Sequence, residues 1–198
     1  MYNSFKTTLI IAFWLFGFTA AQAALITAKT NIDNGYQMFI STDDSVAGTL
    51  IGYGTNWGNT FVDSVSLSAG VTNYLHISAY DLGGIAMLLG EFTLSDTSFE
   101  FANGTQSMLT GDASLLVSLT GFGSGYNATT DLGINGTDPW GLHSGVDATA
   151  RYVWSADAEN DNQVYFSAAI TTVPEPSILA LMGLGLAGLG FSRRRRQS

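Results

Sequence analysis

The sequence predicts an all-β domain, an antiparallel two-sheet β-sandwich or jelly roll, flanked by a cleavable N-terminal signal peptide and a single C-terminal transmembrane helix. Three observations predict the central fold. Apolar and polar residues alternate along several short stretches, turn-forming residues separate these stretches, and the central region offers no convincing amphipathic helix. A period of two residues is that of a half-buried strand, and many short strands joined by turns are typical of two packed sheets.

The alternation places the individual strands. It is clearest over residues 61–68, 74–79 and 164–170, where one phase is apolar and the other is rich in Ser and Tyr. Weaker signals predict six further strands at residues 25–30, 36–41, 49–53, 85–94, 114–120 and 148–154. Residues 121–135 are rich in glycine and show no alternation, so we expect a long loop there.

The same phase predicts the burial of single side chains. His76 falls on the polar phase of its strand, so we expect it at the surface. Trp154 ends a predicted strand and is expected in the core. Trp140 follows a proline and is expected at the surface.

The predicted domain covers residues 24–172, a length that fits one domain able to bury its own core. The chain has no cysteine. It therefore has no disulfide, no thiol nucleophile and no cysteine-bound zinc, and we expect no cofactor beyond the calcium considered below.

The charge of the domain excludes one class of partner. The whole chain has a net charge of −9, but residues 24–173 hold only Lys29 and Arg151 against fifteen of the sixteen acidic residues, which leaves −13. Nucleic-acid binding needs clustered basic residues, so we expect no nucleic-acid partner.

The N-terminus reads as a signal peptide over residues 1–23. Lys6 gives a basic start, residues 9–18 form an apolar core, and Ala21 and Ala23 are small residues at the two positions that signal peptidase recognises. We expect cleavage after Ala23, with signal peptidase as a partner.

The C-terminal segment, residues 173–198, has three parts. Val173 precedes Pro174, Glu175 and Pro176; an uncharged stretch then runs to Ser192; and four arginines follow. Seventeen residues of helix at about 1.5 Å each reach roughly 25 Å, barely enough for a bilayer core of ~30 Å. The arginine cluster predicts a cytoplasmic C-terminus and an exported domain; its members are Arg193, Arg194, Arg195 and Arg196.

This arrangement resembles the PEP-CTERM sorting signal of Gram-negative, exopolysaccharide-producing bacteria. The resemblance implies recognition of Pro174, Glu175 and Pro176 by a membrane-embedded exosortase, with the arginines setting orientation. It implies an inner-membrane-anchored intermediate that is processed and passed to the cell surface or the extracellular matrix. It does not fix the scissile bond.

A second resemblance concerns the domain itself. Residues 33–39, 51–57, 67–70, 74–81 and 83–86 are similar to the order of turns and strands in galactose-binding-domain-like β-sandwiches. The resemblance covers residues 24–101, about half of the domain, and implies a sugar ligand.

Five residues have the chemistry of a glycan site. Aromatic faces pack on sugar rings while carboxylates and amides bond to hydroxyls. The candidates are Tyr53, Asn56, Trp57, Tyr80 and Asp81. The alternative is that Trp57 plugs the end of the sandwich and Asp81 caps a turn.

A second candidate site is a calcium site. Asp157, Glu159 and Asp161, with Asn160 and Asn162, concentrate oxygen ligands of the kind Ca²⁺ prefers. The spacing is not that of an EF-hand, so the alternative is a solvated hairpin turn between strands ending at Trp154 and starting at residue 163.

Two functional hypotheses follow. The first is a non-catalytic, glycan-associated binding or structural module of an exopolysaccharide or biofilm matrix, with extracellular polysaccharide as its partner and no catalytic residue. No nucleophile elbow, zinc motif or phosphate loop occurs in the sequence, which argues against an enzyme. The alternative is a secreted carbohydrate-active hydrolase with an unrecognised carboxylate pair, because the sequence does not show which two of its acids lie close together.

Overall fold

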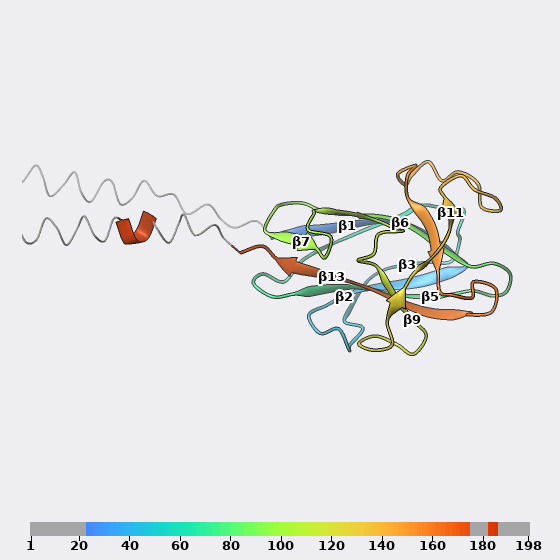
Figure 1. Cartoon of the computed structure of the whole chain (residues 1–198), viewed down its shortest axis with the longest axis horizontal. Helices are drawn as coiled ribbons and strands as arrows, with labels where there is room; N and C mark the ends of the chain where they lie inside the picture. The colour runs from blue at the N-terminus through green and yellow to red at the C-terminus, as the bar shows by residue number, and fades with distance from the viewer. Residues whose placement is uncertain (1–22, 175–181, 186–198) are drawn as a thin grey trace, which may run out of the picture.

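The computed structural model describes residues 23–174 and 182–185. Two antiparallel sheets lie one over the other (Figure 1), which confirms the predicted two-sheet arrangement. Sheet A has the order β11-β12-β6-β1-β4, with β8 paired to β6; sheet B has the order β10-β9-β13-β5-β2-β3, with β7 paired to β13. The bounds in sheet A are β1 (Leu25–Asp33), β4 (Phe61–Ser66), β6 (Met87–Leu94), β8 (Ser107–Leu109), β11 (Thr130–Ile134) and β12 (Arg151–Trp154). Those in sheet B are β2 (Gly35–Ser41), β3 (Thr49–Gly54), β5 (Asn73–Tyr80), β7 (Phe99–Phe101), β9 (Leu116–Ser118), β10 (Asn127–Ala128) and β13 (Gln163–Thr172).

All nine predicted strands are present, and four short ones were missed. The missed strands are β7, β8, β10 and β11, which have two to five residues each. The prediction of one long loop over residues 121–135 is wrong in its second half, which forms β10 and β11. Both strands lie at the ends of their sheets, and β11 is interrupted by a register shift next to Gly133, so no apolar alternation marks them.

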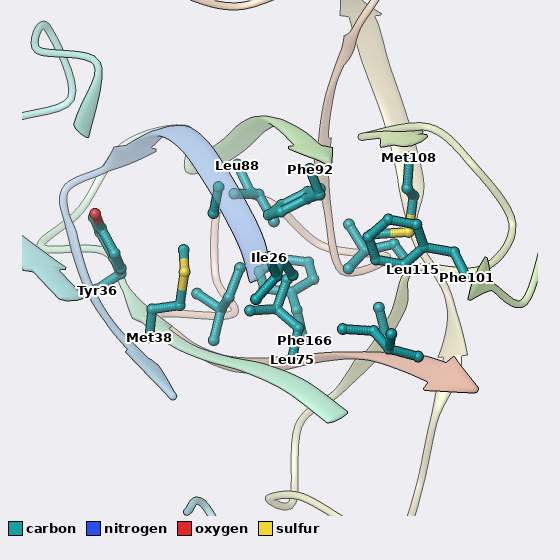
Figure 2. Close-up of a cluster of buried hydrophobic side chains, with 14 of the residues drawn as sticks. Ile26, Tyr36, Met38, Leu75, Leu88, Phe92, Phe101, Met108, Leu115 and Phe166 are labelled. Carbon is teal, nitrogen blue, oxygen red and sulfur yellow. The ribbon is translucent and has the colours of Figure 1, made fainter. Parts of the chain in front are cut away.

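The core lies between the two sheets (Figure 2) and is built from the apolar phases that the alternation predicted. Leu75 and Ile77 of β5 and Phe166 of β13 point inward from sheet B and are at most 1% exposed. Ile26 of β1 and Phe92 of β6 meet them from sheet A. Trp154 is fully buried, as predicted, and its ring packs edge-on against Phe166.

One predicted connection is wrong in topology. The segment between β12 and β13 was expected to be a hairpin turn, but β12 lies in sheet A and β13 lies in sheet B. The segment therefore crosses from one sheet to the other. Trp154 Nε1–H donates to the carbonyl oxygen of Asp161 at 2.9 Å and fixes this crossing to the end of β12.

Trp140 belongs to a second apolar cluster, so its predicted surface position is also wrong. It is 8% exposed and packs 4.9 Å from the ring of Tyr152. The cluster consists of Met87, Leu89, Trp140, Val146, Ala150 and Tyr152. Met87 and Leu89 alternate along β6 with Leu88, which belongs to the main core, so the connection between β11 and β12 folds over the outer face of sheet A.

Candidate functional site

The five candidate glycan residues fall into two groups. Tyr53 lies on β3 and Tyr80 ends β5, both in sheet B. Asn56 and Trp57 lie in the connection between β3 and β4, and Asp81 follows β5. The structure therefore divides them between a sheet face and a set of loops.

The loop residues are engaged with their own backbone. Asn56 Oδ1 accepts from the Gly58 N–H at 3.0 Å, and Asp81 Oδ2 accepts from the Gly83 N–H at 2.8 Å. Asp81 is only 6% exposed, which matches the turn-capping alternative. Trp57 is 37% exposed, and its ring stands edge-on to the ring of His143 at 6.0 Å.

The sheet residues belong to a larger face that points away from the core. Gln37 of β2 lies directly opposite Tyr53 on one side and Ser78 of β5 on the other. Ser78 in turn lies opposite Tyr165 of β13. The next residues along these strands, such as Met38 and Ile77, are buried in the core, so this row faces outward.

Tyr80 and Gln163 form a second row beside the first. They pair across β5 and β13, and Gln163 Nε2–H donates to Ser78 Oγ at 3.1 Å. Tyr80 lies across Gly35 of β2: a Cβ at Gly35 would lie 2.6 Å from its hydroxyl oxygen. We call the two rows together the tyrosine–glutamine face; its members are Gln37, Tyr53, Ser78, Tyr80, Gln163 and Tyr165.

The tyrosine–glutamine face is open and uncharged. Tyr53 is 70% exposed, Gln37 and Gln163 are exposed, and the other three members are half-buried. Among the described strands of sheet B, Glu100 of β7 is the only Asp, Glu, Lys or Arg, whereas five of the six strands of sheet A carry at least one. The strands of sheet B therefore contribute only one of the domain's acidic residues, and none to this face.

Loop residues border the face, and we call three of them, Asp44, Phe122 and Tyr126, the wall. Phe122, from the connection between β9 and β10, stacks on the His76 ring at 4.1 Å and meets the Tyr165 ring edge-on at 5.2 Å. His76 is fully buried, so its predicted surface position is wrong. The polar phase of β5 is covered here because two loops fold back over sheet B.

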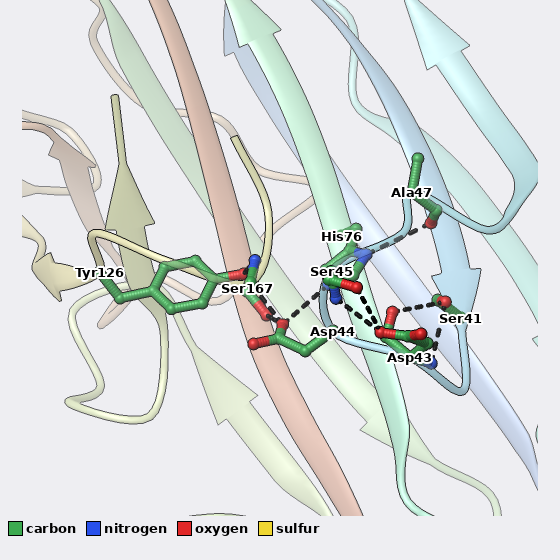
Figure 3. A network of polar contacts seen from close by, with 9 residues as sticks. Ser41, Asp43, Asp44, Ser45, Ala47, His76, Tyr126 and Ser167 are labelled. Carbon is green, nitrogen blue, oxygen red and sulfur yellow. Dashed lines mark hydrogen bonds and ion pairs between the residues drawn. The ribbon is translucent and has the colours of Figure 1, made fainter. Parts of the chain in front are cut away.

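Asp44 fastens these loops to the sheet (Figure 3). Its Oδ1 accepts hydrogen bonds from His76 Nε2 at 3.1 Å, from Tyr126 Oη at 2.9 Å and from Ser167 Oγ at 2.9 Å. His76 Nδ1 lies 3.3 Å from the carbonyl oxygen of Ala47. The wall thus joins the connection between β2 and β3 to the connection between β9 and β10.

The sequence identified two of the six face residues. The other four face residues were missed. The wall was missed because Asp44, Phe122 and Tyr126 lie in glycine- or aspartate-rich loops, where alternation says nothing about contacts. A usable signal was present in the strands themselves: the outward phases of β2, β5 and β13 hold no carboxylate although the domain is strongly acidic.

A polar cluster under the second apolar cluster links β1 to the loops. Asn31 Nδ2–H donates to His143 Nδ1 at 3.0 Å, and Trp140 Nε1–H donates to Asp33 Oδ2 at 3.1 Å. Burial lowers the pKa of His143. Burial raises the pKa of Asp33, the Trp140 hydrogen bond opposes this rise, and the charge of Asp81 adds to it.

The candidate calcium ligands form hydrogen bonds within the segment that crosses from β12 to β13. Both oxygens of Asp157 accept from Asn160 Nδ2–H, at 3.0 and 2.9 Å, and Asp161 Oδ2 accepts from Ser155 Oγ at 2.6 Å. Glu159 is exposed, and its N–H donates to Asp157 Oδ1. Within residues 23–174 and 182–185, no group of three His, Cys, Asp or Glu side chains is placed to hold a metal ion.

The export signals fall mostly beyond the described part of the chain. Pro174 is described and exposed, whereas Ala21, Glu175, Pro176 and residues 193–196 lie outside it, as does the predicted signal peptide apart from Ala23. Residues 182–185 are helical, and no helix within the described ranges is long and apolar enough to cross a membrane.

The chain is thus a two-sheet β-sandwich protein with a tail that begins where the last strand ends. Residues 172–196 match the family model described as the PEP-CTERM protein-sorting motif, which confirms the resemblance of the tail. The motif implies processing by exosortase and export through a membrane-associated intermediate. No curated protein and no solved structure matches the chain, so the resemblance of the domain to galactose-binding sandwiches stays a prediction.

Proposed function

We propose that this protein is a cell-surface or extracellular-matrix component that binds glycan without catalysis, as a binding or structural module of an exopolysaccharide matrix. The observation that carries the proposal is the tyrosine–glutamine face, an open and uncharged sheet surface on an otherwise acidic domain.

The chemistry of this face suits sugar rings. Tyrosine rings offer apolar surface to the C–H groups of a pyranose, and the amides of Gln37 and Gln163 both donate and accept hydrogen bonds with hydroxyls. Tyr53 and Tyr165 lie on strands three spacings apart, about 14 Å, so the face can hold more than one ring of a chain.

Charge narrows the class of glycan. A domain with fifteen acidic and two basic residues repels polyanions at long range. The face itself has no cation to pair with a uronate or a sulfate group. The proposal is therefore for a neutral polysaccharide.

Affinity electrophoresis through gels containing the exopolysaccharide of the source cells tests the proposal. Tyr53→Ala removes the most exposed ring of the face and should weaken retention about tenfold, the equivalent of about 1.4 kcal/mol. Val62→Ala is a matched control, because Val62 is 63% exposed but lies on β4 of the other sheet. Equal retention of wild type and Tyr53→Ala would remove the proposal.

A carbohydrate-active hydrolase is the second candidate, and one observation favours it. Burial raises the pKa of Asp33, with a smaller contribution from the charge of Asp81, and a carboxyl of raised pKa is what a general acid in glycoside cleavage requires. Release of reducing ends from the same polysaccharide, abolished by Asp33→Asn, would establish this candidate in place of the first.

A further inference from the structure

The sorting motif begins inside the folded domain. The motif covers residues 172–196, and β13 ends at Thr172. Thr172 pairs with Phe99 of β7, and the Val173 N–H donates to the carbonyl oxygen of Ser98 at 2.9 Å. No linker therefore separates the sheet from Pro174.

One turn holds both ends of the domain. The turn between β6 and β7 runs over residues 95–98 (Figure 1), and Asp96 Oδ1 accepts from the Ser98 N–H within it at 2.8 Å. Ser95 Oγ accepts from the Leu25 N–H at 2.8 Å, and the Ser95 N–H donates to the Leu25 carbonyl at 2.9 Å. The first strand therefore starts, and the last strand ends, on the same turn.

The partner strand of this last segment is anchored in the core. Phe99 is 3% exposed and Phe101 is fully buried, and Ile170 of β13, which pairs with Phe101, is also fully buried. Freeing residues 170–172 as an extended substrate would unpair β7 and expose these side chains. Pro174, in contrast, is exposed and has no N–H to engage.

We infer that the tether of Val173 to Ser98 sets the upstream limit of processing, so that the scissile bond is the Val173–Pro174 bond or one that follows it. The end of the sandwich that carries the 95–98 turn then faces the exosortase. In the net step a peptide C–N bond breaks, water or an amine bonds to the acyl carbon, and the proton of that acceptor goes to the released nitrogen. The inference rests on exosortase sorting. Two readouts distinguish a failure of sorting from a failure of the inference about the scissile bond.

Mass spectrometry of the full chain recovered from the surface of its own cells gives the first readout. We expect a single mature C-terminus at Val173 or later. A C-terminus at or before Thr172 would overturn the inference while leaving sorting intact. An intact chain through Arg196 would overturn both.

Hydrogen exchange on the full-length chain in detergent gives the second readout, which needs no exosortase. We expect slow exchange at the amides of residues 171 and 173, which face β7, and exchange there as fast as in an open chain would overturn the tether. Val173→Pro removes the N–H donor, and it also fixes φ at residue 173 and restricts Thr172, whereas Val173→Ala truncates the side chain and keeps the donor. We expect faster exchange at residue 171 and additional upstream C-termini for Val173→Pro alone; identical behaviour of the two variants would overturn the inference.

Discussion

Nε2 of His76 lies 3.1 Å from Oδ1 of Asp44, and this contact joins the middle of sheet B to the connection between β2 and β3. The same oxygen accepts from Tyr126 and Ser167. One carboxylate thus holds two loops and two strands in place beside the tyrosine–glutamine face.

We expect Asp44→Ala to lower the free energy of unfolding by about 2 to 4 kcal/mol, because it leaves the buried donors of His76 and Ser167 without an acceptor. Urea unfolding measures this loss. Asp43→Ala is the control: the Asp43 side chain accepts hydrogen bonds only from Ser45, within its own exposed turn, so its loss should be clearly smaller than that of Asp44→Ala. Equal losses for the two variants would contradict the central position of Asp44.

A second prediction concerns the edge of the sandwich where β3, at the end of sheet B, lies beside β4, at the end of sheet A. Tyr36 Oη–H donates to Asp63 Oδ2 at 3.0 Å across this edge, and a Cβ at Gly52 would collide with the Asp63 carboxyl. Gly52→Ala should therefore destabilise the domain by about 1 to 3 kcal/mol through overpacking. Gly58→Ala, whose Cβ would approach only Asn56 Oδ1 at 3.3 Å, is the control. A melting temperature unchanged by Gly52→Ala would contradict the close approach.

Stability should fall on mild acidification because of His143. Its pKa is lowered in the folded state by burial, so the unfolded chain binds the proton more tightly. Stability is then fully present above pH 6.5 and falls as the pH drops below that value toward the folded pKa. His143→Gln cannot titrate, so urea midpoints measured on both sides of pH 6.5 should change less for this variant. The same change of urea midpoint with pH in the wild type and in His143→Gln would contradict the role of His143.

Calcium should leave the melting temperature unchanged. The carboxylates of Asp157 and Asp161 already accept hydrogen bonds from Asn160 and Ser155 within the crossing between β12 and β13, so an added ion would have to compete with these bonds. Differential scanning calorimetry in excess Ca²⁺ and in EDTA makes the comparison. A higher melting temperature in Ca²⁺ than in EDTA, abolished by Asp157→Asn, would establish the ion site instead.

Alternation predicted the strands and the core because both depend on local sequence. Leu75 and Phe166 are buried simply because every second residue of their strands faces the other sheet. His76 and Trp140 were misplaced because their burial depends on loops that fold over the outer faces of the two sheets, and no local pattern encodes that contact.

The candidate site was predicted in part for the same reason. Tyr53 and Tyr80 were identified by residue type, but the register between β2, β3 and β5 decides that they share a face with Gln37. Trp57 and Asp81 were grouped with them by side-chain chemistry, which does not decide whether a residue lies on the sheet or in a loop. In the fold, Asp81 caps its own turn and Trp57 lies against His143.

An NMR titration of the ¹⁵N-labelled protein with neutral oligosaccharides from the matrix polysaccharide tests the central claim most directly. We expect the largest amide shifts at Gln37, Tyr53, Ser78 and Tyr165, with residues 56–58 unmoved. Shifts confined to residues 56–58 and 81–85, or no shifts at saturating sugar, would contradict a glycan site on the tyrosine–glutamine face.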